Sequence, residues 1–183
     1  MVYMFLAEGF EEIEALCPLD LLRRAGVSVM TVGVGGKVIR GSHGIETIAD
    51  ITTAEAERLL EKNPAEMVIL PGGMPGTLNL QADPTVNRFI DEAVAKDAYL
   101  AAICAAPLIL GERGLLDGRE AICFPGFEDK LTGAKISSKK VVRDGKIITG
   151  KGMGVALDFG LALVAALVSE EKAAELRAQV QAV

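Results

Sequence analysis

The sequence predicts an α/β protein in which helices cover both faces of a mainly parallel β-sheet. Short, uncharged apolar segments such as Met1–Ala7 and Tyr99–Ile103 are typical of strands buried on both faces. These segments alternate with stretches of helical periodicity, which is the pattern of β-α-β units. The 183 residues contain no linker, repeat or low-complexity segment, so we expect a single domain over residues 1–183.

The first helix follows from the spacing of apolar residues. Gly9 ends the first apolar run, and Phe10–Ala25 is expected to be helical because its apolar residues recur at intervals of three and four. Acidic side chains occupy its first turns, where the positive end of the helix dipole favours them. Pro18 has no backbone N–H, so a kink or a restart is expected there, and Gly26 is a suitable C-terminal stop.

The middle of the chain continues this alternation of strands and helices. Val27–Val34 is predicted to be the second strand, and a glycine-rich turn leads from it into a short hairpin over Lys37–Ile48. A helix follows over Thr53–Lys62, capped by a threonine at its start. Met67–Leu70 is the third buried strand.

The rest of the chain supplies the fourth buried strand and ends in two helices. Pro84–Lys96 is predicted to be an amphipathic helix that Asp83 caps, and Tyr99–Ile103 is the next strand. Asp144-Gly145 between two apolar runs predicts a hairpin. The remaining expected elements are a helix over Ala105–Gly111, strands over Val141–Arg143 and Lys146–Thr149, and helices over Val155–Val168 and Glu170–Ala182.

Composition and charge exclude several classes of function. A net charge of −6, with six Phe, two Tyr and no Trp, provides neither the basic surface nor the stacking platform of a nucleic-acid-binding protein. The longest uncharged apolar run, residues 99–111, is too short to span a bilayer, and the first residues do not resemble a signal peptide. Residues 150–154 match neither a Walker loop nor the dinucleotide fingerprint. We therefore expect a cytoplasmic protein that binds neither nucleic acid nor membranes and uses no cofactor.

The three cysteines do not form a structural framework. An odd number without a C-x-x-C spacing argues against disulfides, and a zinc site lacks ligands because His43 is the only histidine. We therefore expect reduced thiols and no metal. Cys17 and Cys123 have no chemical partner in the sequence and are interpreted as packing residues.

Cys104 is the strongest candidate for chemistry, because it stands at the junction between a buried strand and the following helix. A nucleophile at such a junction sits on a sharp turn with its side chain aimed out of the sheet. The positive end of the following helix is expected to lower the pKa of the thiol and favour the thiolate. The alternative is a buried, inert cysteine, since cysteine is among the most buried residue types.

Two more strand ends are expected beside this cysteine, because the carboxyl ends of parallel strands meet at one edge of a sheet. Gly72 and Gly73 follow the third buried strand, and their N–H groups, together with that of Ala105, are candidates for an oxyanion hole. A simple turn is the alternative interpretation of these glycines.

Glu11, Glu12 and Glu14 are the acids that follow the end of the first strand. The simpler interpretation is a solvated first helical turn. Glu14 is the one expected to point inward, and a carboxyl group buried against a thiol has a raised pKa. His43 is assigned to a surface turn, where a structural or solvent role is more probable than catalysis.

Four segments together resemble the ThiJ/PfpI superfamily, and most closely its branch that holds the Parkinson-associated protein deglycase. They are Ala7–Glu14, Pro18–Gly26, Leu70–Gly73 and Ala102–Pro107, in the right order over nearly the whole chain. The resemblance implies a flavodoxin-like three-layer α/β/α sandwich, akin to class I glutamine amidotransferases. It also implies a homodimer that pairs near the first helix, and the apolar face of Phe10–Leu22 is the patch we expect to pair.

The resemblance further implies a role for each site residue. Cys104 would be the nucleophile, held in a strained backbone conformation. Glu14 would be the protonated acid that hydrogen-bonds its sulfur, favouring the thiolate and able to hold a sulfinate after oxidation. Gly72, Gly73 and Ala105 would supply the backbone donors beside the sulfur.

Two positions depart from the pattern of the superfamily. Its protease and amidotransferase branches carry a histidine beside the cysteine or elsewhere in the site, whereas here Ala105 follows Cys104. The deglycase branch often has a histidine just before a proline, and here that position is Phe124, which would line the substrate pocket. Without an imidazole at either place, a peptidase is disfavoured.

The expected function is therefore a cysteine-dependent deglycase or glyoxalase that acts on methylglyoxal or early glycation adducts, with a role in oxidative stress. Aldehydes are electrophilic enough to need little help from a base, which suits a site without histidine. The alternative is a redox-sensing stress protein or chaperone in which oxidation of Cys104 is the signal. An older label of the superfamily points to thiamine thiazole-phosphate biosynthesis, for which the sequence contains no phosphate loop.

Overall fold

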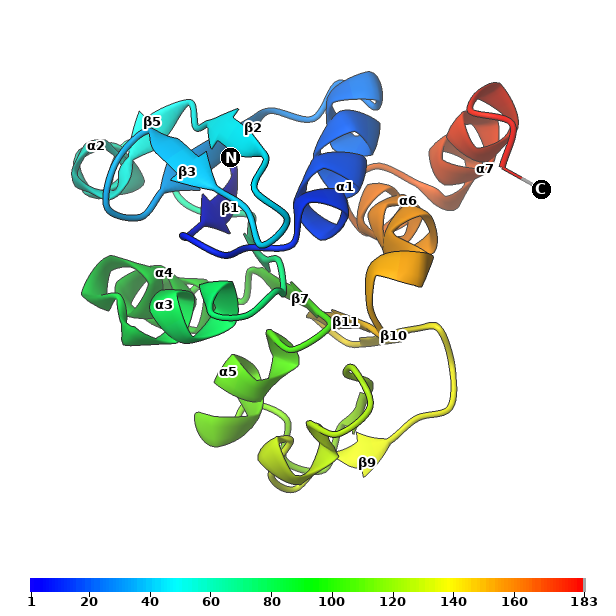
Figure 1. Cartoon of the computed structure of the whole chain (residues 1–183). Coiled ribbons are helices and arrows are strands. Elements are labelled where there is room, and N and C mark those ends of the chain that lie inside the picture. Colours follow the sequence, from blue (N-terminus) through cyan, green and yellow to red (C-terminus); the bar gives the residue numbers. More distant parts are fainter. Residues whose placement is uncertain (183) are drawn as a thin grey trace.

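A seven-stranded β-sheet runs through the computed structural model, which describes residues 1–182 (Figure 1). The sheet contains β1 (Val2–Leu6), β2 (Val29–Gly33), β5 (Ile51–Thr52), β6 (Met67–Leu70), β7 (Tyr99–Ile103), β10 (Val141–Asp144) and β11 (Ile147–Gly150). Its strand order is β10-β11-β7-β6-β1-β2-β5, and all neighbours are parallel except β10 and β11. Two small sheets lie outside it and pair β3 (Val38–Arg40) with β4 (Glu46–Ile48), and β8 (Glu120–Ala121) with β9 (Lys135–Ile136).

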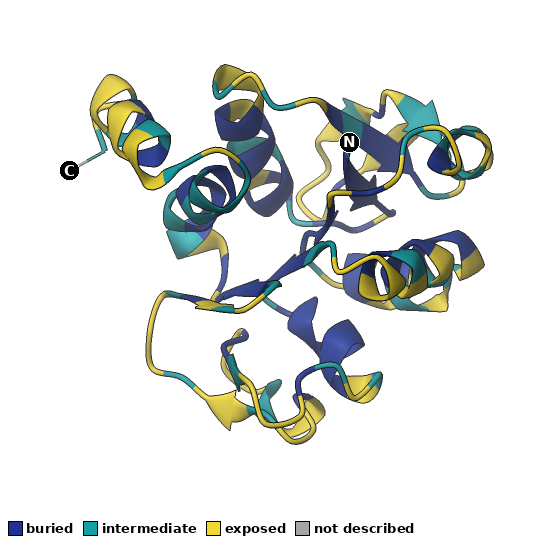
Figure 2. Ribbon diagram, turned by 180° about the vertical axis from the view of Figure 1, so that it is seen from behind, coloured by how far each residue is buried: buried dark blue, intermediate teal, exposed yellow. Residues whose placement is uncertain are grey.

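Helices cover both faces of the central sheet. They are α1 (Glu12–Arg24), α2 (Thr53–Leu60), α3 (Gly76–Ala82), α4 (Pro84–Ala95), α5 (Pro107–Glu112), α6 (Ala156–Leu167) and α7 (Glu170–Gln179). The alternation of side chains along a strand divides β1 between two cores. Tyr3 and Phe5 pack with α2 to α5, whereas Val2, Met4 and Leu6 pack with α1, α6 and α7. The fold is thus a flavodoxin-like three-layer α/β/α sandwich, whose buried middle layer is visible in Figure 2.

Most predicted elements are present with small shifts at their ends. The strand Tyr99–Ile103 has the predicted bounds, and Asp83 caps α4 by accepting hydrogen bonds from two backbone N–H groups. Pro18 does not restart the first helix, because α1 continues through it to Arg24. Sequence reasoning missed β5, α3, β8 and β9, none of which is longer than seven residues, because such short elements carry too few residues to show a period.

The apolar face of Phe10–Leu22 is divided between the core and the surface. Phe10, Leu21 and Leu22 are at most 2% exposed and belong to the core formed by α1, α6 and α7, whereas Ile13 is 48% exposed. The expectation that this segment forms a dimer surface therefore stays a prediction, and it applies to the exposed side of α1 that carries Ile13. Within residues 1–182, no helix combines the length and apolarity needed to cross a bilayer.

Candidate active site

Three neighbouring strands bring the chemically interesting residues to one edge of the sheet. β1, β6 and β7 lie side by side and parallel, so their carboxyl ends coincide. Glu14 follows β1 on the first turn of α1, Gly72 and Gly73 follow β6, and Cys104 follows β7. The expectation that these residues meet is confirmed, because a Cβ placed on Gly72 would lie 2.5 Å from Glu14 Oε2 and 2.6 Å from Cys104 Cβ. Only glycine fits at this position.

Cys104 sits on a strained turn between β7 and α5. Its φ angle is +65°, in the left-handed region that residues with a Cβ rarely adopt. Two backbone hydrogen bonds hold this conformation. The Cys104 N–H donates to the Gly150 carbonyl over 2.9 Å, and its carbonyl accepts from the Phe124 N–H over 2.8 Å. The half-buried thiol is thereby fixed beside the sheet edge.

Glu14 is a fully buried carboxyl group. Its Oε2 accepts a hydrogen bond from the Gly72 N–H over 3.0 Å, whereas Oε1 has no hydrogen-bond partner of good geometry. Burial raises the pKa of Glu14 to about 7. The Cys104 thiol and the Gly72 and Met153 N–H groups lower this pKa, and the charge of Glu11 raises it. The contact with Cys104 is thus a close approach rather than a well-formed hydrogen bond.

The thiol of Cys104 has a raised pKa, contrary to the expectation from the helix dipole. Burial raises the pKa to about 12, and the nearby Glu14 carboxylate raises it too. The N–H groups of Gly73 and Ala105 act in the other direction and are outweighed. α5 has only six residues and starts three positions after the cysteine, so its dipole contributes little at the sulfur.

Cys104 therefore keeps its proton at neutral pH while Glu14 gains and loses one there, so the pair never loses both protons in this range. Loss of both protons would leave two negative charges in close contact in a buried place, which both raised pKa values oppose. Gly73 and Ala105 are the two backbone donors that act on the sulfur. The Gly72 N–H, the third predicted donor, is engaged with Glu14 instead.

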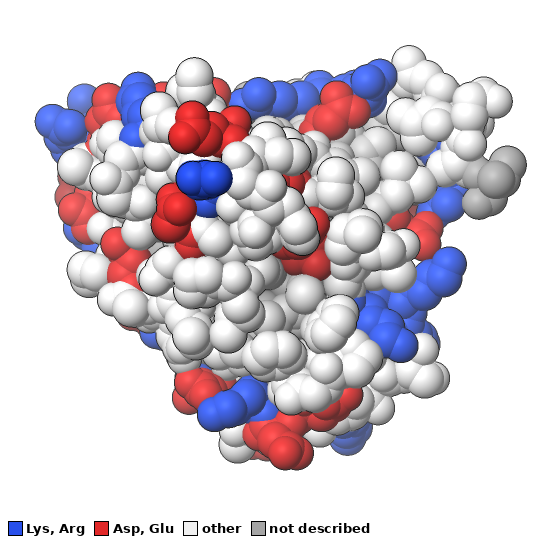
Figure 3. All heavy atoms as spheres, in the orientation of Figure 1, with Lys and Arg blue, Asp and Glu red and all other residues white. Residues whose placement is uncertain are grey.

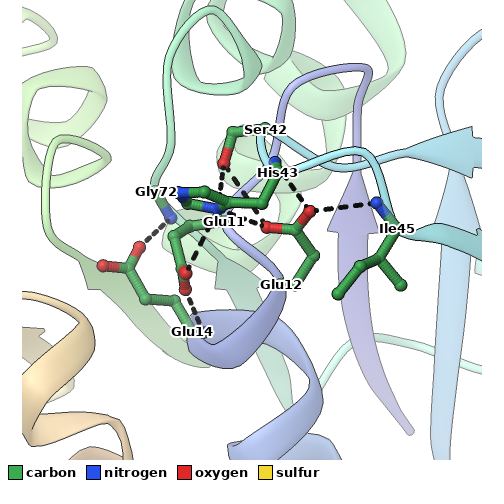
Figure 4. A network of polar contacts seen from close by, with 7 residues as sticks. All are labelled: Glu11, Glu12, Glu14, Ser42, His43, Ile45 and Gly72. Atoms are coloured by element: carbon green, nitrogen blue, oxygen red, sulfur yellow. Dashed lines mark hydrogen bonds and ion pairs between the residues drawn. The ribbon is translucent and has the colours of Figure 1, made fainter.

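The three glutamates at the start of α1 differ in their surroundings (Figure 4). Glu11 caps the helix, with its Oε2 accepting from the Glu14 N–H over 2.7 Å. Glu12 is 2% exposed and points away from Glu14 toward the loop that joins β3 to β4. The inward position expected for Glu14 is thus confirmed, whereas the solvated first turn is wrong for Glu12, because a loop far away in the sequence covers it.

His43 is bound to Glu12 rather than to the cysteine. Its N–H donates to Glu12 Oε1 over 2.8 Å, and its Nδ1 lies 2.9 Å from Glu12 Oε2. Burial raises the pKa of Glu12, but the hydrogen bonds from the His43 ring and from the backbone outweigh it and lower the pKa to about 2. Ligand atoms of Glu11, Glu12 and His43 lie within 4.8 Å of one another, so they are the described residues with metal-ligand spacing. Glu12 already uses both oxygens for hydrogen bonds within the chain.

Sequence reasoning missed the segment after β11, which also lies at the site. A Cβ on Gly152 would lie 3.1 Å from Phe124 Cδ2 and 4.0 Å from Glu14 Oε1. Met153 follows, and its backbone N–H lowers the pKa of Glu14. The sequence feature that could have pointed to this segment is a glycine shortly after the end of a strand, as at Gly72. Phe124 itself is 48% exposed beside this segment.

The other two cysteines lie outside this arrangement. Cys123 is 1% exposed, and burial raises its pKa to about 11. Burial also raises the pKa of the half-buried Cys17. All three cysteines are free thiols.

Comparison with known proteins places the chain in a family. The sequence model of the DJ-1/PfpI family matches residues 1–166. The chain is 34% identical to the Parkinson disease protein 7 homolog of Danio rerio over 179 residues, which cover 96% of this chain and 93% of that protein. It is 30% identical to the glutathione-independent glyoxalase DJR-1.2 of Caenorhabditis elegans, over 90% of this chain and 87% of that protein.

Solved structures agree with the sequence matches. Oxidized DJ-1 from Toxoplasma gondii is 31% identical and superposes with a TM-score of 0.91, covering 98% of this chain and 97% of that one. DJ-1beta from Drosophila melanogaster is 28% identical, also with a TM-score of 0.91, and covers 100% of this chain and 97% of that one.

Proposed function

The chain belongs to the DJ-1/PfpI family, and from that membership we propose that it is a cysteine-dependent glyoxalase or deglycase that needs no cofactor. Cys104 is the nucleophile, and Glu14 moves the protons. The observation that carries this proposal is the buried Glu14 carboxyl group held against a thiol on a strained strand-to-helix turn. A relative named as a glutathione-independent glyoxalase supports the reaction class.

The shared proton suits addition of a thiol to an aldehyde. The Cys104 sulfur forms a bond to the aldehyde carbon of methylglyoxal, the carbonyl π electrons move to oxygen, and Glu14 transfers the proton to that oxygen. A pKa of about 7 lets Glu14 both accept and donate protons near neutral pH. The N–H groups of Gly73 and Ala105 lie beside the sulfur, where the new oxyanion develops.

The hemithioacetal is then converted without an external oxidant. Glu14 removes the hydrogen from the former aldehyde carbon as a proton and returns a proton to the neighbouring carbon, so one carbon is oxidised and the other is reduced. The product is a lactoyl thioester, which water hydrolyses to lactate and the free thiol. Methylglyoxal plus water thus gives lactate. On proteins, the same addition would act on early glycation adducts.

No imidazole takes part in this scheme. His43 is hydrogen-bonded to Glu12, and the resemblance places Ala105 and Phe124 at positions where branches of the superfamily have a histidine. Activation therefore depends on Glu14, and acyl transfer from an unreactive amide is not expected.

Lactate formation tests the proposal. Purified protein incubated with methylglyoxal is expected to produce lactate, whereas Cys104→Ala and Glu14→Leu should lose the activity by at least a hundredfold. Cys17→Ala removes a thiol away from the site and serves as the matched control. Equal activity in the Cys104→Ala protein would overturn the proposal.

A second candidate function is redox sensing through Cys104. The Gly73 and Ala105 N–H groups and the protonated Glu14 carboxyl group are donors suited to the oxygens of a sulfinate, and a relative has been solved in a form named as oxidized. Mild peroxide should then add two oxygen atoms to Cys104 before Cys17 or Cys123, as read by peptide mass spectrometry. A chaperone role would appear as client protection that survives Cys104→Ala.

We also propose a homodimer, with a surface that joins the exposed side of the first helix to a neighbouring hairpin. Val38, Ile45 and Ile48 on the β3–β4 hairpin are 55–76% exposed, and Ile13 on α1 is 48% exposed. Val38 and Ile48 face each other across the hairpin, so their side chains form one patch. The proposed setting is the cytoplasm, which keeps the three thiols reduced.

A further inference from the structure

Three exposed apolar side chains belong to segments whose backbone borders the Cys104–Glu14 pair. Phe124 is 48% exposed, Met153 53% and Met74 44%. They come from three separate segments, and each is joined to the site by its own backbone. Phe124 donates its N–H to the Cys104 carbonyl, Met153 follows Gly152, and Met74 follows Gly73. We call these three side chains the apolar rim.

The contacts place Phe124 near the acid, across Gly152. A Cβ built on Gly152 would be 3.1 Å from the Phe124 ring and 4.0 Å from Glu14 Oε1. Oε1 has no hydrogen-bond partner of good geometry, which suits it to receive a proton from the Cys104 thiol. An aldehyde that bonds to Cys104 on the open side of this pair can therefore extend its substituent toward the aromatic ring.

The charges around the site disfavour anionic substrates. Glu11, Glu12 and Glu14 lie at the start of α1, and Figure 3 shows uncharged side chains filling the middle of the face seen there, with acidic atoms exposed between them. Lys151 is the basic residue next to Gly152, and its side chain is exposed. A neutral substrate with an apolar substituent meets no opposing charge at the rim.

We propose that the apolar rim selects neutral α-oxoaldehydes that carry a large apolar substituent, such as an aryl group, over methylglyoxal. This inference rests on the proposed glyoxalase function. Burying part of an aromatic substituent against Phe124, Met153 and Met74 removes apolar surface from water. Differences of this kind change kcat/KM by about tenfold to a hundredfold.

Paired substrates test the inference. The wild-type protein should show a kcat/KM for phenylglyoxal, measured as mandelate formed, about tenfold above that for methylglyoxal, measured as lactate formed. Measuring product rather than substrate loss excludes reaction of phenylglyoxal with arginine side chains. Phe124→Ser and Met153→Ser should each lower the ratio of the two values severalfold. Val94→Ser, which changes an equally exposed side chain on α4, should leave the ratio unchanged.

A second measurement separates failure of the inference from failure of the proposed function. Benzaldehyde and acetaldehyde add reversibly to a thiol but cannot form a thioester by the internal redox step. Benzaldehyde should protect Cys104 from iodoacetamide at a concentration about tenfold lower than acetaldehyde, and Phe124→Ser should remove that difference. Turnover of both oxoaldehydes with no preference would overturn the inference and leave the function standing. Protection by benzaldehyde without any turnover would overturn the function and leave the rim's selectivity standing.

The oligomeric state of the Phe124→Ser protein tests whether a second copy of the chain covers the apolar rim. A second copy seated on the apolar rim would bury these side chains and leave no room for a substituent. Dissociation of an oligomer by Phe124→Ser, with an unchanged substrate ratio, would assign the rim to that contact and overturn the inference.

Discussion

At the scale of residues, the site depends on one strained backbone conformation and one buried acid. Cys104 at φ +65° costs on the order of 1–3 kcal/mol and persists because the surrounding hydrogen bonds to Gly150 and Phe124 determine it. Burial of Glu14 raises its pKa, which would destabilise the fold if the carboxyl group were forced to ionise. The strained backbone and the buried acid both lower the stability of the fold, which is typical of residues in functional sites.

The pH dependence of thiol alkylation should report the shared proton. Below the raised pKa of Glu14, about 7, the pair carries two protons and Cys104 is unreactive. Above it, one proton remains and sulfur can attack as Glu14 takes that proton. In a Cys17→Ala/Cys123→Ala background, the alkylation rate should therefore rise through about pH 7. Glu14→Gln should abolish this inflection and slow alkylation at pH 8 by roughly tenfold or more.

The exposed Glu46→Gln exchange on β4 supplies the control for that experiment, because its carboxyl group lies on the surface hairpin. The alkylation rate of the Glu46→Gln protein should depend on pH in the same way as that of the parent protein. An inflection near pH 7 that persists in Glu14→Gln would remove Glu14 from the mechanism.

At the scale of elements, the β3–β4 hairpin holds the start of α1 in place. Glu12 receives the backbone N–H groups of His43 and Ile45 as well as the His43 ring, so a surface loop is fastened to the helix that carries Glu14. A Cβ on Gly41 would lie 2.3 Å from the Glu12 carboxylate, so the loop approaches this side chain closely. Sequence reasoning assigned the loop to the surface and could not show that its tip bonds to a buried acid.

Glu12→Gln should lower the free energy of unfolding by about 1.5–3 kcal/mol at pH 6, because hydrogen bonds to a charged acceptor are lost or weakened. The pKa of Glu12 is lowered from 4.5 to about 2, so its contribution is complete above 4.5 and is lost as the pH falls through 2. The pKa of His43 is raised above 6.5 by its hydrogen bond to Glu12, so that contribution is complete below 6.5 and is lost at higher pH. The difference between the two proteins should thus be largest between pH 4.5 and 6.5.

Urea unfolding across this pH range provides the measurement, with Glu46→Gln as the comparison on the same hairpin. The difference in free energy of unfolding between the parent protein and Glu12→Gln could instead stay constant from pH 6 down to pH 2, or Glu46→Gln could lower this free energy equally. Either result would show that the Glu12–His43 contact does not stabilise the fold.

At the scale of the whole molecule, the parallel sheet explains why one edge carries all the chemistry. The carboxyl ends of β1, β6, β7 and β11 lie together because these strands are neighbours or near neighbours in the order of the sheet. The exposed apolar side chains of the β3–β4 hairpin and of Ile13 lie beside the same edge, close to the start of α1. The proposed dimer surface and the proposed active site thus adjoin each other.

Light scattering should give a mass of twice the 19.3 kDa chain. Ile48→Lys places a charge on a side chain that is 76% exposed in the single chain and should raise the dimer dissociation constant by about tenfold or more, with an unchanged circular dichroism spectrum. Val94→Lys, on the exposed side of α4, should leave the mass unchanged. A mass of one chain at all concentrations, or equal effects of the two exchanges, would contradict the proposed hairpin surface.

Much of the fold followed from local patterns. Continuous apolar runs predicted the buried strands of the parallel sheet because a strand covered on both faces has no polar side to show. The strand-to-helix junction singled out Cys104, and the order of the strand ends predicted that Gly72 and Glu14 lie beside it. These inferences need only the period of side chains and the direction of parallel strands.

The sequence by itself thus determined the fold class and which cysteine and which acid are expected to form the site. Only the tertiary structure decided which glutamates are buried, that the Cys104 pKa is raised, and that α6 and α7 pack against Phe10, Leu21 and Leu22. It also brought Gly152 and Met153 to the site from a segment that reads as an ordinary turn. The physical reason is that burial and pKa depend on what other segments place around a side chain, and local periodicity carries no record of those neighbours.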